Sequence, residues 1–196
     1  MQIIERPDSV SWDEIHDVLW KAHAENRRMG INMSHYQWPS EKIRDFIGKT
    51  GVVLVAIKDG KVIGTTAIKE SFKSSWYARG KYAYLCFDCV LPDYRGLGVF
   101  KLLDSKREEI AIQQGYNVFV FDTHLNNTHR QDIAKKNGYR KVGLFWAKDH
   151  YSVIMVKWVE KPYPSIIYCR LRYILSMSKV HLKRWIVGIK GFLYWI

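Results

Sequence analysis

A strand, a glycine-containing turn and a helix follow one another in the middle of this chain, and this succession constrains the fold most. Residues 81–91, KYAYLCFDCVL, are rich in strand formers, PDYRGLG follows as a turn, and residues 99–114 carry apolar residues at helical spacing. Gly115 ends that helix, and residues 116–123, YNVFVFDT, are predicted to be a second strand. Strand, helix and strand in this order form a crossover, so we expect the two strands to be parallel neighbours.

Shorter elements surround this crossover. A short first strand, an amphipathic helix over residues 11–29 that begins with a Ser11–Glu14 capping box, and a second helix over residues 39–47 precede a hairpin that turns at Asp59-Gly60. A short helix stopped by Gly138 and two final strands follow it. The pattern predicts a mixed α/β (α+β) domain with a mixed sheet of about six to seven strands and flanking helices.

The turn at residues 92–98 is predicted to bind an anion. Gly96 and Gly98 allow a ligand to approach the backbone closely, and Arg95 can add a charge-assisted contact. The first N–H groups of the following helix supply further donors and the positive end of the helix dipole. A dinucleotide fingerprint starting at Gly96 would need glycine where Lys101 stands, and this turn lacks the Gly-Lys-Ser/Thr of a P-loop, so neither nucleotide motif fits it.

The stretch VLPDYRGLGVFKLL resembles motif A of the GCN5-related N-acetyltransferases, the GNAT family, whose pattern is Q/R-x-x-G-x-G/A after a strand. Arg95 and Gly98 match this pattern, and Phe100 departs from it. A second stretch, NTHRQDIAKKNGY, is similar to the family's later pattern N-x-x-A-x-x-x-Y-x-x-x-G-F/Y. Asn127, Gly138 and Tyr139 match this pattern. Arg130 and Ala134 depart from it, because they stand in place of the usual Ala and Tyr.

This resemblance, which covers residues 1 to about 159, implies a GNAT fold with acetyl-CoA or another acyl-CoA between two central parallel strands that splay apart. Backbone N–H groups of the turn would hold the pyrophosphate; these belong to Arg95, Gly96, Leu97, Gly98, Val99 and Phe100. Backbone at Val90 and the side chain of Asn127 would contact the pantetheine arm. The side chain of Phe100 either obstructs the phosphate or turns into the helix–sheet packing and leaves its amide for the ligand.

The resemblance also implies direct attack of a neutral amine on the thioester, without a metal. Because Ala134 cannot protonate the leaving thiolate, the candidate proton-transfer residues are His124, just past a strand, and Asp88, on the strand before the turn. The alternatives are a thiolate that leaves unaided or through water, a solvated histidine, and an aspartate that faces solvent or pairs with a lysine.

Residues 26–39, NRRMGINMSHYQWP, lie where the acceptor half of a GNAT site is built. Arg28 suits an anionic group, and Tyr36 and Trp38 suit stacking on a sugar or base; the alternative is a polar loop over packed aromatics. A looser resemblance to GNAT proteins of bacterial surface-polysaccharide gene clusters implies an amino sugar or nucleotide-linked amino sugar as the acceptor.

The formal net charge of +12 is concentrated at the end of the chain. Residues 161–196 hold seven Lys or Arg and no Asp or Glu, which leaves 24 basic and 19 acidic residues, a net of +5, before them. We therefore divide the chain into an acyltransferase domain, residues 1–159, and a basic amphipathic tail, residues 160–196. As a helix from about residue 165, the tail would align Arg172, Lys179, Lys183 and Lys190 in one stripe.

We weigh three roles for the tail: membrane binding, packing and nucleic-acid binding. Residues 165–196 could lie on an anionic membrane surface, or pack on the body or on a second subunit in a homodimer; their apolar content disfavours nucleic acid. The N-terminus has no apolar signal region, and no uncharged apolar run approaches the ~20 residues that span a bilayer. Three cysteines argue against a disulfide framework, and on a strand Cys86 and Cys89 would face opposite sides. We expect a cytoplasmic protein, peripheral on the inner face of the membrane if the tail binds lipid.

The sequence thus predicts an acetyl-CoA-dependent N-acetyltransferase that acts on a small polar amine. The alternative is a catalytically weak module of the same fold that binds acyl-CoA, a membrane or a partner.

Overall fold

The computed structural model describes residues 1–196 except 32–33, 73–74, 79–80, 148–149, 161–163 and 194–196, and it leaves the side chains of 34, 36, 72 and 182–193 undescribed. Its strands are β1 (Gln2–Glu5), β2 (Val52–Lys58), β3 (Lys61–Phe72), β4 (Lys81–Val90), β5 (Val118–His124), β6 (Arg140–Trp146) and β7 (Tyr151–Trp158). Its helices are α1 (Trp12–Ala22), α2 (Ala24–Arg28), α3 (Ser40–Ile47), α4 (Val99–Gln113), α5 (Thr128–Lys136) and α6 (Ile166–Leu193), with short 3-10 turns η1 (Ser34–Gln37) and η2 (Pro92–Tyr94).

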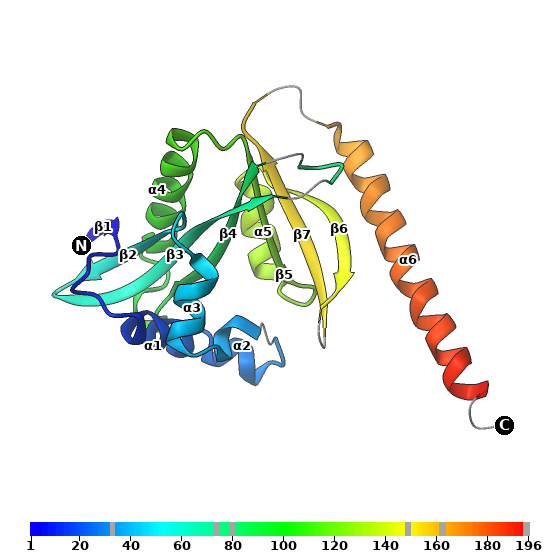
Figure 1. Ribbon diagram of the computed structural model, residues 1–196, viewed down its shortest axis with the longest axis horizontal. Coiled ribbons are helices and arrows are strands. Elements are labelled where there is room, and N and C mark those ends of the chain that lie inside the picture. Colours follow the sequence, from blue (N-terminus) through cyan, green and yellow to red (C-terminus); the bar gives the residue numbers. More distant parts are fainter. Residues whose placement is uncertain (32–33, 73–74, 79–80, 148–149, 161–163, 194–196) are drawn as a thin grey trace. The chain divides into compact units, whose positions relative to one another are not determined.

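The described strands form one mixed sheet in the order β1-β2-β3-β4-β5-β7-β6 (Figure 1). The prediction of a mixed sheet of six to seven strands with flanking helices is therefore confirmed. The chain divides into two compact units, Met1–Val120 and Phe121–Ile196, and β5 carries the chain from one to the other. The separation of a basic tail at residue 160 stays a prediction.

In the first unit, local signals act as the sequence predicts. The Ser11 hydroxyl accepts the Glu14 N–H at 3.1 Å and so begins α1. Asp59 and Gly60 both have positive φ, 50° and 74°, which joins β2 to β3 by the two-residue turn expected for an Asp-Gly hairpin. The helix predicted to run on through residue 29 instead breaks at His23, which separates α1 from α2.

The core of this unit lies between α1, α3 and the sheet. Ile15 and Leu19 on α1 and Ile43 on α3 are fully buried, and they pack in one cluster with Val55 of β2. Because α1 carries its apolar residues at i, i+3 and i+4, one face of the helix is covered by the sheet and the other stays wet. This packing brings the end of α1 to the strands that carry the site.

The strand β4 pairs antiparallel with β3 and parallel with β5, where Ala83 lies opposite Phe119 and Tyr84 opposite Val120. The predicted parallel neighbours are thus confirmed. On the β3 side the partners jump from Cys89 to Cys86, which leaves two β4 residues opposite the single Thr66. This extra residue is a β-bulge, which bends the strand and re-aims the side chains that follow.

The bulge corrects the prediction that Cys86 and Cys89 face opposite sides. Both cysteines pack against the same core cluster, because the inserted residue breaks the simple alternation of the strand. Both are free thiols, and the Cys89 sulfur lies 3.4 Å from the Thr65 hydroxyl. Burial is the largest cause that raises the pKa of the Cys89 thiol to about 11, so this thiol stays protonated near neutral pH.

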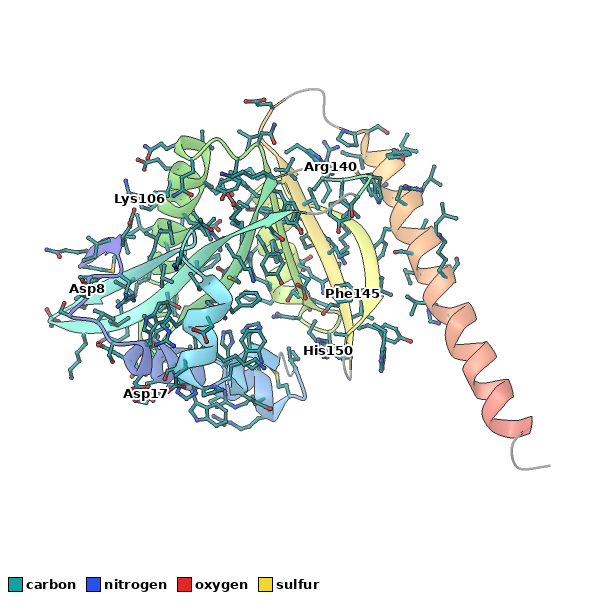
Figure 2. All side chains as sticks on the ribbon, in the orientation of Figure 1. Asp8, Asp17, Lys106, Arg140, Phe145 and His150 are labelled. Atoms are coloured by element: carbon teal, nitrogen blue, oxygen red, sulfur yellow. The ribbon has the colours of Figure 1, made fainter. Side chains whose placement is uncertain are left out.

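The second unit contains the end of β5, the helix α5, the antiparallel pair β6–β7 and the long helix α6. The Phe121 and Tyr139 rings pack edge to face at 5.2 Å. Gly138, with a φ of 88°, ends the helix α5 as predicted. Arg140, labelled in Figure 2, donates to the Pro164 carbonyl just before α6 begins. The helix expected from about residue 165 is present, and no helix in the described part of the chain has the length and apolar content to cross a membrane.

Candidate active site

The glycine turn between β4 and α4 is built by backbone conformation. Gly96 and Gly98 have φ values of 75° and 78°, in the left-handed region that glycine adopts without a steric penalty, and Gly98 is the residue that precedes α4. The Leu102 N–H donates to the Gly98 carbonyl at 3.1 Å, which begins the helical hydrogen bonding. The N–H groups of the first turn of a helix precede this pattern and are the donors that an anion can use.

Space in front of the turn is open. A Cβ atom built on Gly96 or Gly98 would meet no described atom within 4 Å, so crowding does not require glycine at either position. The positive φ values require it, and the open side leaves the backbone accessible to a ligand. Leu97 between them is exposed, Val99 is buried and Phe100 is half-buried on α4.

Arg95 turns toward the protein. Its Nε donates to the Val90 carbonyl at 3.3 Å, one terminal nitrogen donates to Glu25 at 3.1 Å, and the other donates to the Ala22 carbonyl. Ala22 ends α1, where carbonyls lack partners within the helix and the dipole is negative, so a cation is well matched there. The sequence predicts that Arg95 contacts the ligand; in this structure its guanidinium joins the end of β4 to α1 and α2.

The β-bulge sits three residues before Val90 and is held from several sides. Phe87, a fully buried bulky residue, has a φ of 57°, which such residues rarely adopt. Its carbonyl accepts the Thr65 hydroxyl at 2.7 Å, and its ring packs on those of His35 and Phe46 at 5.6 and 5.7 Å. Backbone strain of this kind persists where surrounding contacts enforce it, and it is concentrated at functional sites.

Asp88, the next residue of the bulge, belongs to a buried charge network under α4. Arg107, which is fully buried, donates to the Asp88 and Asp104 carboxylates and, at 2.6 Å, to the Thr66 hydroxyl. Thr66 in turn donates to Asp88 at 2.7 Å. The charged partner of Asp88 is thus an arginine, where the sequence offered a lysine as one alternative. Through Arg107 the network ties the Asp88 carboxylate of β4 to α4.

His23, at the break between α1 and α2, meets the bulge from the other side. Asn26 Nδ2 lies 3.1 Å from His23 Nδ1; an amide nitrogen only donates, so Nδ1 accepts and the ring proton sits on Nε2. Burial is the largest cause that lowers the pKa of His23 from 6.5 to about 3, followed by the neighbouring His35 and Arg95. A hydrogen bond with the Asp88 backbone and the charge of that carboxylate act in the opposite direction on this pKa.

The predicted acceptor residues lie on the segment after α1. Arg28 is exposed at the end of α2. Trp38 is half-buried; its ring packs edge to face on Phe46 at 5.1 Å, and the Lys42 ammonium lies 4.6 Å from its centre. The side chain of Tyr36 is outside the described residues. Arg28 therefore presents an exposed guanidinium, and Trp38 belongs to an aromatic cluster that reaches Phe87 of the bulge through Phe46.

In the second unit, His124 is the last residue of β5 and is buried. Its Nδ1 accepts the Asn126 N–H at 3.0 Å, so the ring proton of the neutral form sits on Nε2. The His124 ring stacks on that of His150 at 4.9 Å, and His150 Nε2 lies 3.2 Å from the Ser152 hydroxyl. The ring is thus fixed in orientation and in tautomer, with Nε2 as a hydrogen-bond donor.

Asn127 and Ala134 follow on α5. The Asn127 side-chain oxygen accepts the Arg130 N–H at 3.2 Å, so this residue caps the helix and leaves ligand contact to its amide NH2. Ala134 is fully buried, and a tyrosine there would have to displace packed neighbours. Where the resemblance implies a tyrosine hydroxyl, α5 therefore carries only the buried methyl group of Ala134.

Several residues around the site were not singled out by sequence reasoning: His23, Glu25, Thr65, Thr66, Arg107 and His150. Arg107 stands in the charged run SKREE, which predicts an exposed helix face, and nothing local marks it as buried. The break at His23 carries no glycine or proline signal. Within the residues that the structure describes, no group of three or more His, Cys, Asp or Glu side chains is placed to hold a metal ion.

Comparisons with known proteins show the family of this chain and solved structures of similar fold. The family model described as the acetyltransferase (GNAT) family matches residues 12–139. Among solved structures, aminoglycoside 6'-acetyltransferase type Ii is similar with a TM-score of 0.63 and 18% identity, covering 84% of this chain and 100% of its own. The PaiA N-acetyltransferase from Thermoplasma acidophilum in complex with coenzyme A has a TM-score of 0.60 and 20% identity, covering 81% and 99%. The ribosomal-protein-S18-alanine N-acetyltransferase from Escherichia coli has a TM-score of 0.62 and 13% identity, covering 84% and 97%. No curated protein sequence matches the chain.

Proposed function

Because the chain belongs to the acetyltransferase (GNAT) family, we propose that it transfers the acetyl group of acetyl-CoA to the amine of a small polar acceptor. The observation that supports this most is the glycine turn at the start of α4, with two positive φ angles and open space on its accessible side. In the reaction, the amine nitrogen bonds to the thioester carbon, the carbon–sulfur bond breaks, and the proton that the amine gives up balances the thiolate that leaves.

The turn is proposed to hold the pyrophosphate of acetyl-CoA through backbone N–H groups, from Gly96 to Phe100. Arg95 contributes indirectly, because its guanidinium is engaged with Ala22 and Glu25. Phe100 does not oppose the proposal: its side chain is half-buried on α4, and a phosphate contact uses the amide rather than the ring. Val90 and Asn127 are proposed to contact the pantetheine arm.

His124 is proposed as the donor that assists the leaving thiolate. Its Nδ1 is engaged by the Asn126 N–H, so the ring proton of the neutral form sits on Nε2, and no ring nitrogen has a lone pair left for taking a proton while that bond persists. The expected role is therefore hydrogen bonding to developing negative charge, which is the type of stabilisation that oriented donors provide.

Asp88, the other residue predicted to take part in proton transfer, is proposed to act as a positioning residue. The carboxylate is engaged by Arg107 and Thr66, while the backbone of the same residue bonds to His23. These contacts fix the β-bulge and hence the end of β4, where the thioester would lie. Removal of the carboxylate is therefore expected to disturb the geometry of the site as a whole.

The acceptor is proposed to be an amino sugar or a nucleotide-linked amino sugar. Exposed Arg28 suits an anionic group such as a phosphate, and the half-buried Trp38 suits contact with a ring. A panel of amines discriminates among acceptors: nucleotide-linked amino sugars, free amino sugars, aminoglycosides and peptides with free N-termini. Acetylation of the peptide alone would contradict this assignment without affecting the proposed reaction.

The enzyme is further proposed to work on the cytoplasmic face of an anionic membrane, to which residues 165–196 would bind. The seven basic residues and the lack of acidic residues in 161–196 support this location, and a homodimer through the same helix is the competing assignment.

Titration calorimetry with acetyl-CoA tests the proposed binding. A saturable heat and a rise in melting temperature are expected. A folded protein that gives neither at millimolar acetyl-CoA would contradict the proposed function. Binding without acetyl transfer to any amine in the panel would favour the alternative of an acyl-CoA-binding module.

A further inference from the structure

The helix α6 has one face that packs on the edge strand β6. Cys169 on this face is buried, and the Ser176 hydroxyl accepts the Leu144 N–H at 2.8 Å and donates to the Tyr173 carbonyl at 2.6 Å. The outward-facing N–H of an edge strand would otherwise need water or another chain, so the helix covers part of this edge. The inner face of α6 is thereby fixed to the β6 backbone by the hydrogen bond between Ser176 and Leu144.

The opposite face of α6 is apolar and exposed. Ile167 is 70% exposed, and Leu171, Ile174 and Leu175 are 54%, 55% and 54% exposed. Their spacing of i, i+4, i+7 and i+8 is that of one helix face. Among the described residues, six of the fifteen exposed large apolar side chains lie within residues 166–175, so this face is a concentrated patch. We call Ile167, Leu171, Ile174 and Leu175 the α6 apolar face.

Basic residues border the α6 apolar face on both sides. At 3.6 residues per turn, Arg170 falls on one edge of the face and Lys179 on the other, and both are exposed. In the sequence, apolar residues continue at the same spacing through Leu182, Trp185 and Ile189. Figure 1 shows that α6 extends beyond the end of β6 within this unit, which agrees with a helix of 28 residues, about 42 Å long, beside a strand of seven.

We propose that the α6 apolar face lies in the interface of an anionic lipid bilayer, parallel to the membrane plane. An apolar stripe bordered by cations and free of acids is complementary to acyl chains below negatively charged headgroups. A second copy of α6 is a poorer occupant, because apposed apolar faces would bring basic borders of like charge together. The inner face, bonded through Ser176 to Leu144, keeps the domain attached while the outer face contacts lipid.

This proposal deepens the proposed membrane location by naming the contact face, and it does not depend on which amine is acetylated. Full-length protein is floated with phosphatidylglycerol vesicles and, separately, with phosphatidylcholine vesicles. The wild type is expected to float with the anionic vesicles only, and added salt is expected to weaken the association.

The variant Leu171→Glu/Leu175→Glu is expected to lower vesicle binding by about tenfold or more, because carboxylates replace apolar groups and are repelled by the lipid. The matched control is Ile112→Glu, which places a glutamate at an exposed apolar residue of α4 and should bind vesicles as the wild type does. Arg170→Gln/Lys179→Gln should weaken binding and reduce its salt dependence. All variants should retain acetyl transfer to a soluble amine, so a failure of membrane binding is distinguishable from a failure of the enzyme.

Circular dichroism checks that α6 remains helical, and Leu171→Asn/Leu175→Asn serves in place of the glutamate pair if it does not. Three results would overturn the proposal. They are folded wild type that stays with neither kind of vesicle, a leucine variant that floats like the wild type, and a dimer in light scattering that the leucine variant dissociates while no vesicles are bound.

Discussion

The guanidinium of Arg95 donates to the backbone carbonyl of Ala22, so a side chain of the glycine turn closes the C-terminal end of α1. The same guanidinium bonds Glu25 on α2 and the Val90 carbonyl at the end of β4. The turn proposed to bind acetyl-CoA is thus joined through one residue to α1 and to α2, and α2 carries the proposed acceptor residue Arg28.

Arg95→Ala should therefore destabilise the protein by about 1–2 kcal/mol, from the range for charged hydrogen bonds discounted for the partial exposure of the side chain. It should also raise the KM for the acceptor, since α1 and α2 lose their tie to the turn. Urea unfolding and steady-state kinetics measure the two effects. Arg28→Ala, an exposed arginine at the end of α2, is the control for stability and should change it by less than about 0.5 kcal/mol. Equal unfolding free energies for the two variants would show that the Ala22 contact is not stabilising.

Gly98→Ala tests the role of the turn in ligand binding. Gly98 and Gly60 have φ values of 78° and 74°, and an added Cβ would meet no described atom within 4 Å at either site. Both alanine variants should lose about 1 kcal/mol of unfolding free energy from backbone strain. Calorimetry should show weaker acetyl-CoA binding for Gly98→Ala alone, because only that Cβ stands where the ligand approaches. A parallel loss of affinity in Gly60→Ala would mean that binding reports general stability.

Arg107→Met tests the buried network beneath α4. The change removes the cation that bonds the Asp88 and Asp104 carboxylates, which should cost about 3–5 kcal/mol of unfolding free energy. Neutralising both partners in Arg107→Met/Asp88→Asn/Asp104→Asn should restore a large part of it, since no buried charge is then left uncompensated. Guanidinium chloride unfolding measures both variants. A triple variant as unstable as the single one would indicate that packing of the arginine, rather than charge, determines the loss.

The role of His124 is tested by two amides of different length. Glutamine places an N–H near the position of Nε2, whereas asparagine reaches only the position of Nδ1. If His124 serves as an Nε2–H donor, kcat should fall by less than about tenfold in His124→Gln and by about 100-fold in His124→Asn, in line with the loss of one oriented donor. Nitrogen chemical shifts of the His124 ring should identify the Nε2–H tautomer in the resting protein. Equal losses of kcat in both variants would favour proton transfer by the imidazole over hydrogen bonding.

His23 should make stability fall as the solution is acidified. Its pKa is lowered from 6.5 to about 3 on folding, so between these values the unfolded chain binds more protons than the folded one. The contribution is fully present above pH 7, and about 2 kcal/mol of it should be lost at pH 5, at 1.36 kcal/mol per pKa unit. Urea unfolding at pH 7.5 and pH 5 measures the slope, and His23→Gln should remove this part of it. The same slope in wild type and variant would exclude His23 as its source.

Local signals explain which parts of this fold the sequence predicts. The hairpin at Asp59-Gly60 and the cap at Ser11 each depend on residues that are neighbours in the chain, and both form as expected. The bulge at Phe87 is different, because its carbonyl is held by Thr65 of another strand. Pairing of this kind depends on sheet register. No residue near Cys86 and Cys89 indicates the bulge, so simple strand alternation placed the two cysteines on opposite sides.

The same limit applies to the candidate site. The sequence marks Gly96 and Gly98 through their spacing, but it does not show that Arg95 turns back to Ala22. Arg107 resembles its exposed charged neighbours until the packing of α4 on the sheet is known. For α6, the helix itself follows from composition, whereas the division into inner and outer faces depends on the contact of Ser176 with β6.

The central claim is that the chain moves an acetyl group from acetyl-CoA to an amine, and free thiol released from acetyl-CoA tests it most directly. Thiol release is followed with wild-type protein, acetyl-CoA and each amine of the acceptor panel, beside reactions without amine. We expect release that depends on both enzyme and amine and that falls in Gly98→Ala but not in Gly60→Ala. Release no faster than spontaneous hydrolysis with every amine, from protein that binds acetyl-CoA, would contradict it.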